Sequence, residues 1–151
     1  ILMYHMKPTD AVALYNRYIG DWGGTSTSYR FEAVKNGKVV KVVRKEPVTS
    51  MHLSAEPDHQ NLTERHTYEA AEIRIRALDQ NDNIVNFYQE QVVLSAEGPI
   101  AIIGPKIISL QGGMGGTYVR TTGEEGIGIL KIRAAQMEEQ RIQFEVKNDR
   151  K

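Results

Sequence analysis

The chain has 151 residues, with 19 Lys and Arg against 19 Asp and Glu, and it has no cysteine. This length suits one domain, and 40% hydrophobic residues provide a core, which excludes global disorder. The zero net charge argues against nucleic acid or an anionic membrane as a partner, because both attract a basic excess. Without cysteine there is no disulfide framework and no thiolate metal site, so the redox compartment stays open.

The first ten residues are apolar but are interrupted by His5, Lys7 and Pro8. They lack the basic region and the small-residue cleavage site of a signal peptide. No run of 18 apolar residues predicts a membrane span. Because the first residue is not Met, we interpret the chain as a fragment of a longer polypeptide, and such a fragment need not carry the activity of its parent.

A short helix-like stretch follows Pro8. Thr9 or Asp10 is a candidate N-cap, apolar side chains recur at helical spacing, and the glycines of residues 20–24 end the segment. A stretch this short is marginal as an isolated helix, so propensity leaves a helix and an extended arm open. We predict an N-terminal arm or linker over residues 1–24.

From Ser28 onward, apolar and polar residues alternate with the period of two that is typical of half-buried strands. Asn36-Gly37 between two such runs predicts a hairpin. A polar loop is expected at 56–66 and a glycine turn at 112–116, and the further expected strands are 48–55, 71–77, 84–88, 92–96, 100–103, 107–110, 117–121, 127–134 and 141–146.

These short strands, with turn signals about every 8–12 residues and no helix between them, predict an all-β fold. The expected architecture is an immunoglobulin-like, antiparallel two-sheet sandwich over residues 25–147. A polar tail at 148–151 follows it. Helical crossovers are absent from the pattern, so a parallel α/β sheet is excluded.

The polar segment 79–83 resembles a calcium-binding loop in composition. An EF-hand needs Gly at its sixth position and Glu at its twelfth, whereas Ile84 and Glu90 stand there. A turn in which the Asp79 side chain hydrogen-bonds nearby backbone is therefore the favoured interpretation.

Carboxylates and histidines are the candidate side chains for acid–base catalysis or metal binding. Glu124 and Glu125 are adjacent between glycines, whereas the two carboxylates of a glycosidase face each other across about 5–9.5 Å, so we predict a solvated turn. His52, His59 and His66 lack the i, i+4 spacing of a helical metal site. We predict no catalytic residue, no metal site and no cofactor in this chain.

Tyr15, Tyr18 and Trp22 form the most distinctive aromatic cluster, and Trp22 is the only tryptophan. Their i, i+3, i+7 spacing would place them on one helix face, although Gly20 makes a helix of that length doubtful. They are candidate substrate-binding residues because aromatic faces stack on sugars. The favoured interpretation is that they pack on the sandwich or on a neighbouring domain, since large rings are seldom left in water.

Three groups of segments together carry a family resemblance: LYNRYIGDWG from Leu14 with YRFEA from Tyr29, AEIRIRALD from Ala71 with VVLSAEGP from Val92, and IIGP from Ile102 with ISLQGG from Ile108 and YVRT from Tyr118. In combination they resemble the C-terminal immunoglobulin-like domain of glycoside hydrolase family 2 enzymes of the β-galactosidase type. The resemblance extends over residues 14–146.

This resemblance implies a non-catalytic accessory or structural domain of a bacterial enzyme, cytoplasmic or secreted, whose parent is a β-galactosidase-like glycosidase. In such enzymes the catalytic acid and nucleophile lie on a separate barrel domain, so no catalytic residue is carried over to this chain. The implied partners are the catalytic barrel and neighbouring domains of the same polypeptide. Two alternatives remain: a carbohydrate-binding module, which would present a row of exposed aromatics to a glycan, and an adhesin-type spacer.

Overall fold

The computed structural model describes residues 7–18 and 26–149, and it divides the chain into two compact units, Ile1–Pro47 and Val48–Lys151. The first unit holds α1 (Pro8–Tyr18), β1 (Tyr29–Lys35) and β2 (Lys38–Lys45). The second unit holds β3 (Met51–Pro57), β4 (Asn61–Glu64), β5 (Ala70–Asp79), β6 (Gln91–Glu97), β7 (Ile100–Ile103), β8 (Ile107–Ser109), β9 (Met114–Thr121), β10 (Gly126–Ala134) and β11 (Gln140–Asn148).

The helix α1 begins at Pro8, whose fixed φ and missing N–H suit the first helical position. The backbone N–H of Lys7 donates to Asp10 Oδ2 at 2.9 Å. Asp10 thus stabilises the first turn from inside the helix, as in a capping box, and is not itself the predicted N-cap. Of the two conformations that propensity left open for this segment, the structure has the helix, which extends to Tyr18. No described helix is long and apolar enough to cross a membrane.

The strands β1 and β2 form the predicted hairpin around Asn36-Gly37. Both turn residues have positive φ, 52° and 73°, as a tight two-residue hairpin turn requires. Within the described part of the chain these two strands form a sheet of their own, whereas the predicted sandwich over 25–147 included them. Tyr29 and Phe31 stack with ring centroids 6.4 Å apart, and each stays 58% exposed.

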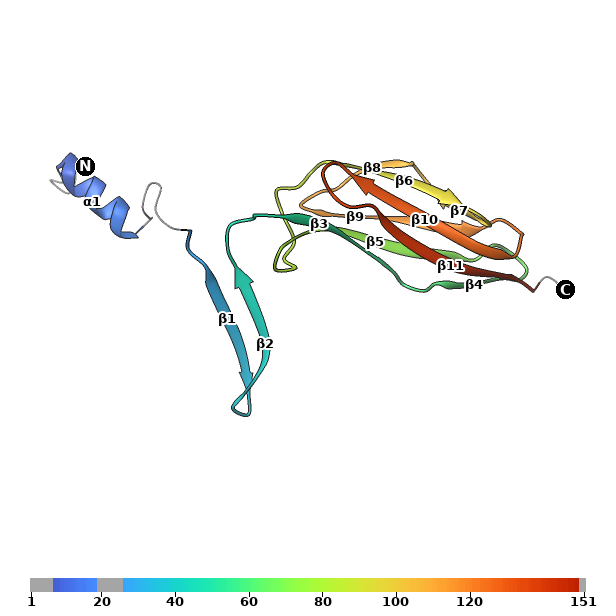
Figure 1. Cartoon of the computed structure of the whole chain (residues 1–151), viewed down its shortest axis with the longest axis horizontal. Coiled ribbons are helices and arrows are strands. Elements are labelled where there is room, and N and C mark those ends of the chain that lie inside the picture. Colours follow the sequence, from blue (N-terminus) through green and yellow to red (C-terminus); the bar gives the residue numbers. More distant parts are fainter. Residues whose placement is uncertain (1–6, 19–25, 150–151) are drawn as a thin grey trace. The chain divides into compact units, whose positions relative to one another are not determined.

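The second unit is a two-sheet sandwich, whose strands run along its length in Figure 1. One sheet has the strand order β4-β11-β10-β6-β8 and the other β3-β5-β9-β7. The all-β sandwich prediction is confirmed, but the sheets are not wholly antiparallel, because β11 pairs with β4 in parallel. The loop predicted at 56–66 is wrong in its centre, since β4 forms there by pairing with the distant β11.

The core lies between the two sheets and follows the alternation seen in the sequence. In β5 the inward side chains are fully buried, while Glu72, Arg74 and Arg76 point away from the core. The opposite sheet contributes Leu94, Leu130, Ile132 and Phe144, each at most 1% exposed. The predicted register of the β5 segment is therefore confirmed.

Two local predictions were wrong. The strand expected at 84–88 is a single bridge between Leu78 and Ile84, after which the chain turns, with Val85 and Tyr88 buried. The glycine turn is shorter than 112–116, because only Gly112 and Gly113 have positive φ there and β9 already begins at Met114. Gly115 is a packing requirement: a Cβ on it would lie 2.7 Å from Leu110 Cδ2.

Replacing Ile75 by Ala tests the register of β5. Ile75 is fully buried, so we expect the free energy of unfolding to fall by about 2–5 kcal/mol through lost contacts and a residual cavity. The neighbouring Arg74→Ala serves as the matched control and should change stability little, because the Arg74 side chain is 62% exposed. Urea unfolding monitored by circular dichroism measures both; the reverse ranking would mean that β5 presents its other face to the core.

Candidate functional site

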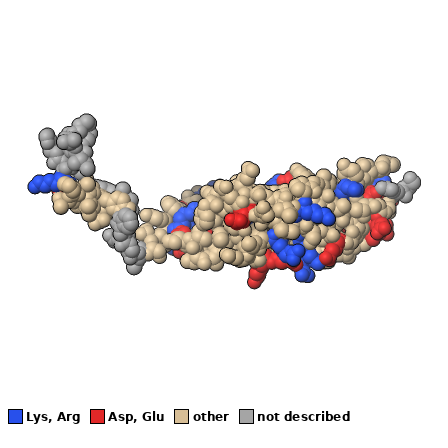
Figure 2. Space-filling view, turned by 90° about the horizontal axis from the view of Figure 1, so that it is seen from above, with Lys and Arg blue, Asp and Glu red and all other residues tan. Residues whose placement is uncertain are grey.

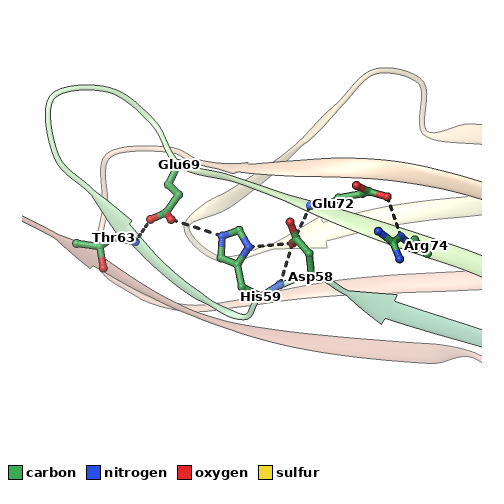
Figure 3. A network of polar contacts seen from close by, with 6 residues as sticks. All are labelled: Asp58, His59, Thr63, Glu69, Glu72 and Arg74. Atoms are coloured by element: carbon green, nitrogen blue, oxygen red, sulfur yellow. Dashed lines mark hydrogen bonds and ion pairs between the residues drawn. The ribbon is translucent and has the colours of Figure 1, made fainter.

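A network of polar contacts surrounds His59, in the connection between β3 and β4 (Figure 3). His59 Nδ1 lies 2.9 Å from Asp58 Oδ1, and His59 Nε2 lies 3.5 Å from Glu69 Oε1. The second contact allows charge attraction but has no hydrogen-bond geometry, and Nε2 is buried without a hydrogen-bond partner among the described residues. The imidazole is thus held between two carboxylates.

Both carboxylates are also committed to backbone groups. Asp58 Oδ1 accepts the N–H of His59 at 2.8 Å and that of Glu72 at 3.0 Å, and Glu69 Oε2 accepts the N–H of Thr63. These bonds tie the β3–β4 connection to β5 and to the segment just before it. The network thus stabilises this part of the backbone.

The pKa of Asp58 reflects this environment. Partial burial alone would raise it, but the hydrogen bonds from the His59 and Glu72 amides, together with the nearby imidazole, hold the pKa below its ordinary value. The ionised carboxylate is therefore the form that the fold stabilises.

The Asp79 segment forms the expected turn. Asp79 is 5% exposed, and its Oδ1 accepts the backbone N–H groups of Asn81 at 2.8 Å and Asn83 at 2.9 Å, as well as the Asn83 side-chain amide at 3.1 Å. Asp82 follows with a positive φ of 60°. Asp79 Oδ1 is thus occupied by N–H donors, and the predicted side-chain-closed turn is confirmed.

Glu124 and Glu125 lie exposed in the connection between β9 and β10, as the prediction of a solvated turn required. Glu125 Oε1 accepts the N–H of Asn148 at 3.0 Å, which ties this turn to the end of β11. Of the histidines, His52 pairs with Asp82 at 3.3 Å, away from His59 in the fold. Over residues 7–18 and 26–149, no group of three or more acidic or histidine side chains is placed to hold a metal.

The structure places the predicted aromatic candidates only in part. Tyr15 lies on α1 with 37% of its surface exposed. Tyr18 is the last residue of α1, and its side chain lies outside the described part, as does the whole of Trp22. Their role as substrate-binding residues therefore stays a prediction.

Sequence reasoning missed an aromatic pair in the β5–β6 connection. Phe87 is 70% exposed, whereas the adjacent Tyr88 is 6% exposed. They line a hollow of about 450 Å³, whose other walls are Met51, Gln89, Glu90, Ala135 and Gln136. The sequence does hold a local indication of this pair. The segment NFYQEQ lacks the strict alternation of a half-buried strand, and amide and carboxylate side chains flank its two rings.

Comparison with known proteins identifies the relatives of this chain. No family model matches it. A β-galactosidase of Rhizobium radiobacter is 33% identical over 135 residues, which are 84% of this chain and 92% of that protein. The chain belongs to the β-galactosidase family.

A second β-galactosidase, from Rhizobium meliloti, is 34% identical over 99 residues, but the match spans only 13% of that longer protein. Among solved structures, a glycosyl hydrolase family 2 member from Bacteroides cellulosilyticus superposes with a TM-score of 0.65 at 15% identity, over 80% of this chain and 17% of the other. The predicted resemblance to family 2 enzymes is confirmed. Within these longer proteins the chain matches one small part, as an accessory domain does.

The lowered pKa of Asp58 predicts how this β-galactosidase-family chain responds to acid. Because the folded pKa lies below the unfolded one, the stabilisation is complete above about pH 4 and is lost as the pH falls through the folded pKa. We expect Asp58→Asn to flatten the loss of stability between neutral pH and pH about 2.5. Urea unfolding at several pH values measures this.

The exposed Glu138→Gln is the matched control and should follow the wild-type pH profile. A profile of Asp58→Asn that is equally steep would show that the hydrogen bonds to Asp58 do not favour its ionised form in the folded state.

Proposed function

We propose that this chain is a non-catalytic accessory domain of a β-galactosidase-like glycosidase, with a structural role towards the catalytic barrel and neighbouring domains of the same polypeptide. The observation that carries the proposal is the small share of the longer relatives that it matches. It corresponds to 13% of the Rhizobium meliloti β-galactosidase, a part too small to hold the whole of that enzyme. The names of the relatives supply the activity of the proposed parent.

The chemistry of the sandwich supports the non-catalytic role. Four of its carboxylates accept hydrogen bonds from the backbone: Asp58 and Glu69 in the His59 network, Asp79 in its turn, and the buried Glu64, whose Oε2 accepts the N–H of Gly123 at 2.8 Å. A glycosidase needs one carboxyl that donates a proton and a second that is free to act as base or nucleophile. Carboxylates engaged with backbone are poorly suited to both tasks.

The hairpin supports the structural partnership. A two-stranded sheet is at best marginally stable alone, yet Tyr29, Phe31 and Val34 are each at least 58% exposed. Residues 29–46 also hold six Lys and Arg against two Glu. An exposed hairpin that is both apolar and basic suits an acidic neighbouring domain that covers it.

A nucleic acid is the weaker candidate for a partner. On the face shown in Figure 2, Lys and Arg side chains lie among Asp and Glu of the sandwich, and the balance over the whole chain is zero. Binding to a polyanion relies on a surplus of positive charge along the contact.

The purified 151-residue chain is expected to hydrolyse no glycoside. The test incubates it with chromogenic β-galactosides and β-glucosides and follows release of the chromophore. The adjacent, exposed Glu124 and Glu125 lie in a turn, and Glu125 accepts the N–H of Asn148. Turnover that persists through purification and disappears in Glu124→Gln or Glu125→Gln would refute the non-catalytic assignment. Turnover unchanged in both variants identifies a contaminating hydrolase and leaves the expected absence of activity intact.

Tryptophan fluorescence tests the role of the aromatic arm, since Trp22 is the only tryptophan. If Tyr15, Tyr18 and Trp22 pack against protein, the emission should be blue-shifted and poorly quenched by acrylamide, and millimolar galactose or lactose should leave it unchanged. Free N-acetyltryptophanamide serves as the exposed reference. A red-shifted emission that responds to sugar would instead assign these residues to carbohydrate binding.

A further inference from the structure

We propose that the hollow beside Phe87, at the end of the sandwich where β5 connects to β6, binds a neutral saccharide. This is a binding activity beyond the structural role proposed above, and it does not depend on that role. It also concerns residues other than the aromatic arm, since Phe87 lies 65 positions after Trp22 in the sequence.

The hollow has the dimensions of a ligand site. The Phe87 hollow, of about 450 Å³, shares Gln89, Glu90 and Ala135 with an adjoining hollow of about 620 Å³ that reaches Ser109 and Arg133. The shared residues join the two into one groove along the β5–β6 connection and the turn between β10 and β11. Pockets for small molecules fall in this range of volume.

The side chains of the groove suit a pyranose. Phe87, 70% exposed, offers an apolar ring to the C–H face of a sugar. Gln89, Glu90 and Gln136 are exposed around it and provide amide donors, amide acceptors and a carboxylate acceptor for hydroxyl groups. The groove holds one acid, Glu90, and one base, Arg133, which itself pairs with Glu139 at 3.6 Å. An apolar platform with several uncharged hydrogen-bonding groups and balanced charges favours a neutral saccharide over an anionic one.

Tyr88 gives a second, independent indication of a ligand. It lines the same hollow, it is 94% buried, and no described group hydrogen-bonds its hydroxyl. Burial, together with the charge of Glu90, raises the pKa of Tyr88, so the hydroxyl keeps its proton and remains a donor. A buried hydroxyl without a partner is costly. Because Tyr88 lines the hollow, a small shift of its ring that brings the hydroxyl to an oxygen of a bound molecule would remove that cost.

The groove is preformed, because backbone hydrogen bonds fix the connection that carries both rings. Tyr88 N–H donates to Val85 O at 2.9 Å, Gly113 N–H donates to Tyr88 O at 2.9 Å, and Leu110 N–H donates to Glu90 O at 3.1 Å. Gly113 is required for this approach, since a Cβ there would lie 2.5 Å from Val85 O. A platform held in place before binding loses little conformational entropy when a ligand arrives.

The other exposed aromatics of the sandwich are less suited to a sugar. Arg120 already covers the ring of Tyr68, with its guanidinium carbon 5.5 Å from the ring centroid. Tyr118, 50% exposed, lies on the outer face of its sheet between Glu72 and Ile103 on the adjacent strands, and it lines none of the hollows described above. Tyr118 therefore provides a matched control for Phe87.

The test is a titration of the ¹⁵N-labelled 151-residue chain with lactose and with β-1,4-galactobiose, followed by amide chemical shifts. We expect shifts concentrated at residues 87–91 and 133–136, with a dissociation constant of about 0.1–10 mM. Phe87→Ala and Glu90→Gln should each weaken binding at least about tenfold, whereas Tyr118→Ala should leave it unchanged. The amide spectrum of each variant verifies its fold, which exposed positions such as 87 and 90 should leave intact.

Three results would overturn the proposal. The first is the absence of shifts with both saccharides at concentrations of about 50 mM, well above the expected dissociation constant. The second is a set of shifts confined to other residues, including the N-terminal arm. The third is binding that survives both Phe87→Ala and Glu90→Gln in folded protein, because the saccharide would then not depend on the groove.

Discussion

The strict alternation of β5 is the constraint on which the rest of the sandwich depends. Its four inward residues, Ala71, Ile73, Ile75 and Ala77, have no exposed surface, and its neighbours β3 and β9 each pair with seven of its ten residues. A slip of one residue would turn this apolar face to water and bring Glu72, Arg74 and Arg76 into the core. The register of β5 therefore determines which side chains of the whole sheet form the core and which meet solvent.

Polar side chains fix the chain where the strands end. Asp79 closes the turn after β5, the His59 network ties the β3–β4 connection to the start of β5, and buried Glu64 holds the turn after β9 through the N–H of Gly123. Each of these carboxylates satisfies backbone donors that the sheets leave unpaired. These particular carboxylates therefore contribute to the stability of the sandwich.

The two surfaces with functional interest differ in kind. The β1–β2 hairpin presents an exposed apolar and basic face of the sort that another domain covers, and it supports a structural place within a larger enzyme. The groove at Phe87 is concave, rich in amide groups and held by backbone hydrogen bonds, features of a small-molecule site. An accessory domain can combine both, because its contacts with neighbours and its free loops use different parts of the chain.

The sequence by itself determined the elements with a local physical signal. Alternation predicted the strands β5, β6, β10 and β11 and the inward faces of β5 and β6, and Asn36-Gly37 and Asp79 specified their turns through short-range backbone geometry. Only the tertiary structure decided what depends on residues far apart in the chain: β4 forms because β11 lies beside it in parallel, and His59 meets Glu69 because β5 returns past the β3–β4 connection. The different exposure of Phe87 and Tyr88 was likewise decided by the tertiary structure. Local sequence offers two similar rings, and the packing of Gly113 and Leu110 against their connection leaves one exposed and buries the other.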